Sequence, residues 1–89
     1  MEATTSVDDA LFASVIVAPN PFTTQLRLVC NGAMGHYDLL NAQGVVVRRG
    51  NMDGSEVVIE TSDLTSGLYL LRLTAESGTT KTITVVKER

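Results

Sequence analysis

Histidine and cysteine, which often carry out acid–base and nucleophilic chemistry near neutral pH, are few in this chain. Its 89 residues hold one histidine, His36, and one cysteine, Cys30. A triad or a metal site needs several converging partners, which the chain can barely supply. We therefore expect His36 to face solvent at the start of a strand. Cys30 follows Leu26 and Leu28 at a spacing of two, so we expect a small core residue, with a nucleophilic thiol as the alternative.

The carboxylates are scattered along the chain. Asp8 and Asp9 are adjacent but could bind a cation only weakly, and the Asp53-Gly54 turn lacks the run of oxygen ligands of a calcium loop. The stretches GNMDG and SGTT contain glycines near hydrogen-bond donors, yet neither lies between a strand and a helix, so we do not expect phosphate binding there. The sequence predicts no enzyme active site, no metal site and no cofactor.

The charge balance argues against two classes of binding partner. The formal net charge is −3 and there is no stripe of Lys and Arg, which argues against nucleic acid or an anionic membrane surface. No apolar run approaches the roughly 20 residues of a membrane helix, so direct membrane insertion is not predicted. A single cysteine allows no internal disulfide. A homo-oligomer is possible but not predicted.

The elements that carry these residues read as short β-strands behind a leader. Residues 1–13 are small, polar or acidic apart from Val7, Leu11 and Phe12, and we expect an extended linker. Because Met1 is followed by an acidic segment rather than a signal peptide, the chain is either cytoplasmic or the C-terminal part of a longer exported protein. Residues 14–89 are expected to form one β domain. Runs with a period of two predict strands at 14–18, 24–30, 35–41, 45–49, 56–61, 68–75 and 79–87.

Alternation and turn chemistry together predict the fold. Leu26 and Leu28 share a strand face with Cys30, and Tyr69, Leu71 and Leu73 share another, so these faces should be core. Glycine-containing turns at NAQG, MDGS and AESG predict three hairpins. About seven short strands with frequent turns indicate an all-β, immunoglobulin-like sandwich of two antiparallel sheets, with an open barrel as the alternative.

Two features at the ends of the β domain stand out. Pro19 and Pro21 fix their own φ, and the Asn20 side chain can bond local backbone, so this corner should separate an extended leader from the folded body. An ordinary stop to an edge strand is the alternative. The last strand, with Ile83 and Val85 on one face, ends in three charged residues whose removal should take away little apolar area. These residues, Lys87, Glu88 and Arg89, are either a recognition handle or a solubilising tail.

Three stretches resemble a known family. The order Val17 to Pro21, then HYDLLNAQGVVV, then IETSDLTSGLYLLRLTAESGTTKTITVVK is similar to the type A C-terminal sorting domain of the type IX (Por) secretion system of the Bacteroidetes. The likeness runs from about Val7 to Arg89, and DLTSGLYLLRL carries most of it. Ala18 departs from the aromatic residue often found before Pro-Asn-Pro. The positions that match the family's motifs are Pro19, Asn20 and Pro21, then Tyr37, Asp38 and Gly44, then Gly67, Tyr69, Gly78 and Lys87.

The resemblance implies an address label rather than an enzyme. In that family the domain ends a cargo protein, is recognised in the periplasm and directs passage across the outer membrane to the cell surface or the medium. A sortase-like surface protease then usually removes it, at a site we expect before Pro19. The implied partners are the type IX translocon, that protease and the cargo domains of the same chain. An immunoglobulin-like adhesion or spacer module is the alternative. The expected recognition residues are Pro19, Asn20, Pro21, Gly67, Tyr69, Gly78, Lys87, Glu88 and Arg89.

Overall fold

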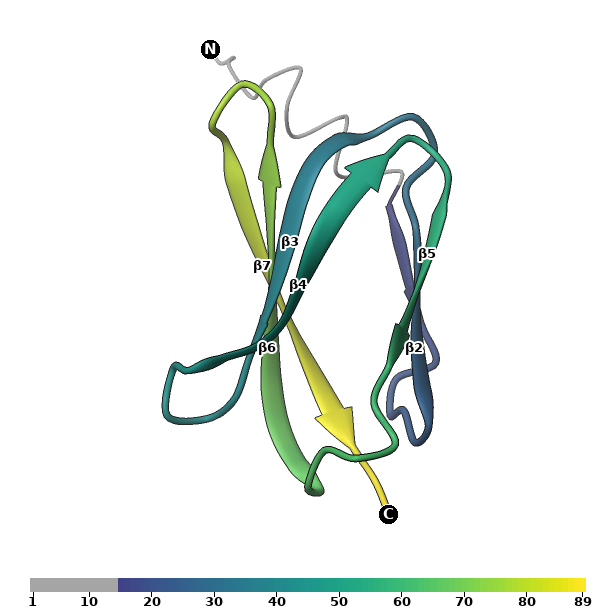
Figure 1. Cartoon of the computed structure of the whole chain (residues 1–89), viewed down its shortest axis with the longest axis vertical. Helices are drawn as coiled ribbons and strands as arrows, with labels where there is room; N and C mark the ends of the chain where they lie inside the picture. Colours follow the sequence, from purple (N-terminus) through teal and green to yellow (C-terminus); the bar gives the residue numbers. More distant parts are fainter. Residues whose placement is uncertain (1–14) are drawn as a thin grey trace, which may run out of the picture.

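Seven strands build the part of the chain, residues 15–89, that the computed structural model describes. The expected leader, residues 1–13, lies outside the described residues. Six strands begin and end within two residues of their expected bounds, and β4 is longer than expected. The strands are β1 (Ile16–Ala18), β2 (Gln25–Val29), β3 (Met34–Leu40), β4 (Val46–Asp53), β5 (Glu56–Glu60), β6 (Gly67–Ala75) and β7 (Thr80–Lys87) (Figure 1).

The strands form two sheets that face each other. One sheet has the order β1-β2-β5 and the other β4-β3-β6-β7, and every strand pair is antiparallel. Figure 1 shows the two sheets side by side, with the turn after β4 crossing from one to the other. The orders correspond to strands A-B-E and C′-C-F-G of immunoglobulin-like domains. The predicted two-sheet sandwich of seven strands is confirmed, and the open barrel is wrong.

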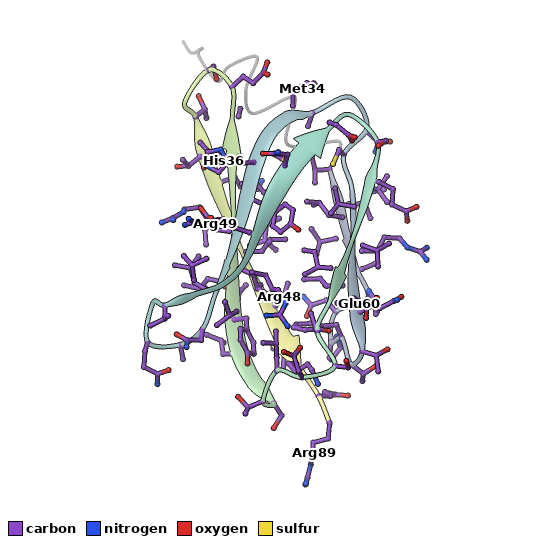
Figure 2. The ribbon with its side chains drawn as sticks, in the orientation of Figure 1. Met34, His36, Arg48, Arg49, Glu60 and Arg89 are labelled. Carbon is purple, nitrogen blue, oxygen red and sulfur yellow. The ribbon has the colours of Figure 1, made fainter. Side chains whose placement is uncertain are left out.

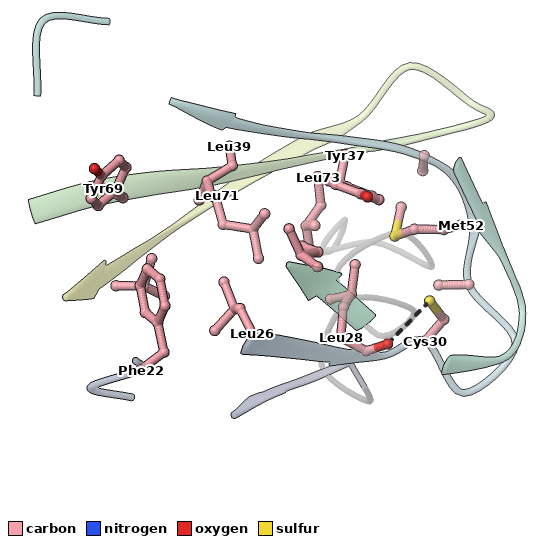
Figure 3. Packing of buried hydrophobic residues seen from close by; sticks show 14 residues of the cluster. Phe22, Leu26, Leu28, Cys30, Tyr37, Leu39, Met52, Tyr69, Leu71 and Leu73 are labelled. Carbon is pink, nitrogen blue, oxygen red and sulfur yellow. Dashed lines mark hydrogen bonds between the residues drawn. The ribbon is translucent and has the colours of Figure 1, made fainter. Parts of the chain in front are cut away.

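The core lies between the sheets, on the faces predicted from the alternation. Leu26, Leu28 and Cys30 are fully buried, as are Leu71 and Leu73 (Figure 3). Burial raises the pKa of the Cys30 thiol, with the charge of Asp53 adding to the effect. Cys30 is therefore a packed core residue rather than an exposed nucleophile.

Two of the three predicted hairpins are confirmed. The NAQG turn joins β3 to β4, and the AESG turn joins β6 to β7. The MDGS turn is not a hairpin, because β4 pairs with β3 in one sheet and β5 pairs with β2 in the other. Its backbone bonds to the neighbouring β2–β3 connection, with Cys30 N donating to the carbonyl of Ser55 at 3.0 Å and Gly32 N to that of Gly54 at 3.0 Å. Both of these connections cross between the sheets, and N–H groups of the β2–β3 connection are satisfied by carbonyls of the MDGS turn.

The expected end of β4 at residue 49 is wrong. The strand continues to Asp53, with Gly50 opposite Tyr37 and Met52 opposite Gly35. A Cβ on Gly50 would lie 2.6 Å from the Tyr37 hydroxyl oxygen. Glycine is therefore required here for the close approach of a buried ring, although glycine in a sequence more often indicates a turn.

Candidate functional site

The Pro19-Asn20-Pro21 corner lies on the edge of the last strand. Its three residues are exposed, and they follow β1 directly. The side-chain amide of Asn20 donates to the carbonyl of Thr84 at 3.3 Å, and its Oδ1 accepts a hydrogen bond from Val86 N at 3.1 Å. The expectation that Asn20 bonds local backbone is therefore wrong, since its partners are 64 and 66 residues away.

Phe22 continues the contact that Asn20 begins. Its backbone N–H donates to the carbonyl of Val86 at 2.9 Å, and its carbonyl accepts from Glu88 N at 2.8 Å, which makes a parallel bridge to Lys87. The Phe22 ring is fully buried and meets the Tyr69 ring edge to face, with 6.1 Å between centroids. The segment after β1 thus leaves the three-stranded sheet and closes onto the four-stranded one.

Tyr69 is a buried residue of β6 rather than a surface one. Its hydroxyl donates to the carbonyl of Thr65 at 2.7 Å, four residues upstream in the β5–β6 loop. This is the tyrosine corner of immunoglobulin-like domains, in which a tyrosine at the start of strand F holds the preceding connection. Any effect of Tyr69 on recognition must therefore pass through the shape of the loop that it holds.

Lys87 differs from what its charge predicts. It is in phase with Ile83 and Val85 and is 7% exposed, so its aliphatic stem packs on the core side of β7. Its Nζ donates to the carbonyl of Glu88 at 3.0 Å. The expectation that the last three residues contribute little to the core is wrong for Lys87, whereas Glu88 and Arg89 are exposed.

Gly67 and Gly78 occupy the two ends of the β6–β7 hairpin. Gly67 begins β6 with φ of 145°, and Gly78 lies in the connecting turn with φ of 98°. Both glycines are exposed, and a Cβ on either would meet nothing within 4 Å. Their backbone conformation, rather than space, is what calls for glycine.

Asp38 of the second motif is the centre of a charged row on the outer face of the four-stranded sheet. Asp38 is opposite Arg49 on β4 and Arg72 on β6, with contacts of 3.2 and 3.1 Å to the two guanidinium groups. Burial alone would raise the pKa of Asp38, but the hydrogen bonds and charges of Arg72 and Arg49 outweigh it and hold the pKa below its ordinary value. The pattern of the sequence did not single out either arginine.

Phe22, like the two arginines, was not predicted from the sequence. It follows Pro21 and precedes two threonines, so it belongs to no alternating run. The signal that could have found it is a lone large apolar side chain directly after a rigid corner.

The remaining candidate chemistry stays dispersed. His36 is exposed on β3, as expected. Among residues 15–89, no three His, Cys, Asp or Glu side chains lie close enough to hold a metal ion. No helix in that part of the chain is long and apolar enough to cross a membrane.

The fold and the closed corner define an immunoglobulin-like module in which the first and last parts of the β domain are joined. Comparison with known proteins is consistent with this class. The family model described as "Secretion system C-terminal sorting domain" matches residues 16–87. Among solved structures, one similar chain is PorZ, an essential surface component of the type IX secretion system of Porphyromonas gingivalis. The TM-score is 0.76 at 18% identity, over 94% of this chain but only 13% of that one. No curated protein sequence matches.

The chain belongs to the family of secretion system C-terminal sorting domains. It is a sorting signal of the type IX secretion system of the Bacteroidetes, and its sorting leads to the outer membrane, the cell surface or the medium. The domain is therefore involved with the type IX secretion machinery.

Proposed function

We propose that this domain acts as a folded export address without catalytic activity of its own. On this proposal it is read in the periplasm by the type IX translocon and is then removed by a sortase-like surface protease. The observation that carries the proposal is that the first and third motifs meet in one structure, where Asn20 and Phe22 bind the end of β7. Residues 64 or more positions apart in the sequence are thus brought together by folding. This arrangement supports recognition of the signal in its folded form.

The recognition roles of the motif residues divide by their exposure. Pro19, Asn20 and Pro21 are exposed, as are Glu88 and Arg89, so these five have side chains that a partner could touch, whereas the exposed Gly67 and Gly78 have none. The other four candidates act through the fold, by burial or by backbone conformation: Tyr69, Lys87, Gly67 and Gly78.

The position of β1 refines the proposed cleavage site. Because β1 pairs with β2, residues upstream of the proline corner belong to the described sandwich. A protease cleft binds several residues in an extended, unpaired form, and a cleavage site before Ile16 leaves the pairing of β1 with β2 intact. We place the processing site there or further upstream.

A fusion experiment tests the proposal. Residues 1–89 are placed after a reporter that carries its own signal peptide, in a type IX-competent bacterium, with a strain lacking the secretion system as control. The expected result is protease-accessible reporter on the surface of the competent strain only. N-terminal sequencing of the released domain should give a start at or before Ile16. A reporter retained in the periplasm of both strains, or a start after Pro21, would contradict the proposal.

A spacer or adhesion module is the second candidate, favoured by the immunoglobulin-like order of the strands. It predicts that the domain stays attached to the mature surface protein. The same sequencing experiment separates the two, because an uncleaved domain supports the spacer.

A further inference from the structure

The outer face of the four-stranded sheet carries an apolar patch. Residues on the solvent side of an antiparallel sheet are usually polar. Here Leu68 on β6 and Val86 on β7 are opposite each other and are 48% and 40% exposed. Leu70 on β6 is opposite Leu40 on β3, and Leu40 is in turn opposite Val46 on β4. We call these five residues the outer patch: Leu40, Val46, Leu68, Leu70 and Val86.

The core does not explain these side chains. In β6 the buried residues Tyr69, Leu71 and Leu73 alternate with the outward positions, so Leu68 and Leu70 point away from the sandwich. Both belong to DLTSGLYLLRL, the stretch that most strongly indicates the family. A contiguous apolar patch on a small domain commonly marks an interaction site.

A cationic row borders the outer patch. Arg72 follows Leu70 by two positions on the same face, and Arg49 lies across Asp38 from it. Two arginines share one carboxylate, so one positive charge is unmatched, although the whole chain has a net charge of −3. Figure 2 shows Arg49 directed away from the sandwich, whereas its neighbour Arg48 lies between the sheets on the side of Glu60.

The opposite face has a different character. On the three-stranded sheet Arg27 pairs with Glu56, and Gln25 bonds Glu60, so two carboxylates accompany one arginine. The two outer faces thus offer a partner different charge as well as different apolar area. Electrostatic complementarity selects partners by such differences.

We propose that the outer patch and its arginine row form the docking surface for a folded protein partner whose contact surface has an apolar centre bordered by carboxylates. The inference rests on the proposed function, in which this partner is a component of the export machinery. A second copy fits less well, because Asp38, the carboxylate beside the patch, is already held by Arg49 and Arg72 and offers nothing to the arginines of another copy.

Two matched double variants test the inference in the reporter fusion. Leu68→Thr with Val86→Thr changes the outer patch, and Ile16→Thr with Val58→Thr changes two residues of the other sheet that are 55% and 45% exposed. Threonine has the β-branched shape that strands favour. We expect surface display to fall about tenfold for the first pair, as when two central anchors leave an interface, and to stay unchanged for the second. The melting temperatures of the wild-type domain and the two double variants should agree within a few degrees.

A third variant tests the arginine row. This test remains informative even if Leu68→Thr with Val86→Thr lowers the melting temperature of the domain. Arg72→Gln leaves Asp38 its contact with Arg49 and should lower display several-fold, while Glu56→Gln on the other face should not. Equal display of the wild-type and patch-variant fusions would overturn the inference alone. Retention of the wild-type fusion in the periplasm would overturn the proposed function and, with it, this inference. A wild-type dimer that Leu68→Thr with Val86→Thr dissolves would show that a second copy covers the patch, and would also overturn it.

Discussion

The side chain of Asn20 occupies the place of a strand backbone beside Val86. Its Oδ1 accepts from Val86 N at 3.1 Å while its Nδ2 donates to the carbonyl of Thr84 at 3.3 Å. Two residues further on, after Pro21, the backbone N–H of Phe22 donates to the carbonyl of Val86. A proline has no N–H to give to a strand pair, and the Asn20 side-chain amide offers this edge both a donor and an acceptor. The edge of β7 is thereby covered over its last residues.

Replacement of Asn20 by Ala should release this edge. Both side-chain bonds disappear, and we expect a loss of about 1 kcal/mol in the free energy of unfolding, since the bonds are exposed to water. The sharper measurement is amide hydrogen exchange, in which Val86 N–H should lose protection while Leu71 N–H, in the middle of β6, keeps it. Unchanged protection of Val86 in Asn20→Ala would show that the side chain does not hold the strand.

Tyr69→Phe should isolate the tyrosine corner from the packing of the ring. The variant keeps the contact with Phe22 but loses the bond to the carbonyl of Thr65, at a cost of about 1 kcal/mol in unfolding free energy. Tyr37→Phe is the control, because the Tyr37 hydroxyl makes no hydrogen bond to any residue between 15 and 89. Urea denaturation of the two variants should give a lower midpoint for Tyr69→Phe only.

Leu68 and Leu71 are three positions apart on β6 and therefore lie on opposite faces of the sheet. Leu71 is fully buried, and its replacement by Ala should cost about 2–5 kcal/mol through lost contacts and a cavity. Leu68→Ala, on the exposed face, should change the unfolding free energy by less than about 1 kcal/mol. Comparable losses in the two variants, measured by chemical denaturation, would contradict the strand phase.

Shortening the C-terminus should affect stability in steps. Removal of Arg89 alone takes away an exposed residue, so the melting temperature should not change. Removal of residues 87–89 also deletes the buried Lys87 stem and the bond from Glu88 N to Phe22, and should lower the melting temperature by about 4–8 °C for each kcal/mol lost. Export of the longer truncation must therefore be compared with its melt. Identical melting of both truncations would place Lys87 outside the core.

The Asp38 row should make stability depend on acid. The pKa of Asp38 is lowered in the folded state, so the folded form binds its proton less readily than the unfolded form. Its stabilisation is present above the ordinary carboxyl pKa of about 3.9 and is lost as the pH falls through the folded value. Denaturation midpoints from pH 7 to pH 2 should decline less steeply for Asp38→Asn than for the wild-type domain. The variant should also be less stable at pH 7, because two arginines lose their carboxylate. Parallel declines would remove Asp38 from the acid response.

Strand phase and class of fold could be predicted from the sequence because they depend on local order. Alternate residues of a strand point to opposite faces whatever the partner strand is, so the buried positions of Leu26, Leu28 and Leu71 follow from spacing. Turn residues at NAQG and AESG likewise act within four residues. The family likeness is local too, since it is carried by three ordered stretches of sequence.

The tertiary structure alone decided which segments meet. The MDGS turn looks like a hairpin by its residues, yet it crosses between sheets because β5 finds its partner in β2. Gly50 indicates a turn by type but lies inside β4, where a buried tyrosine ring needs the space of a side chain. The partners of Asn20 and the burial of Lys87 depend on the edge of β7, more than sixty residues from the corner. Such contacts form only when the two sheets pack together, so the spacing of residues along the sequence does not predict them.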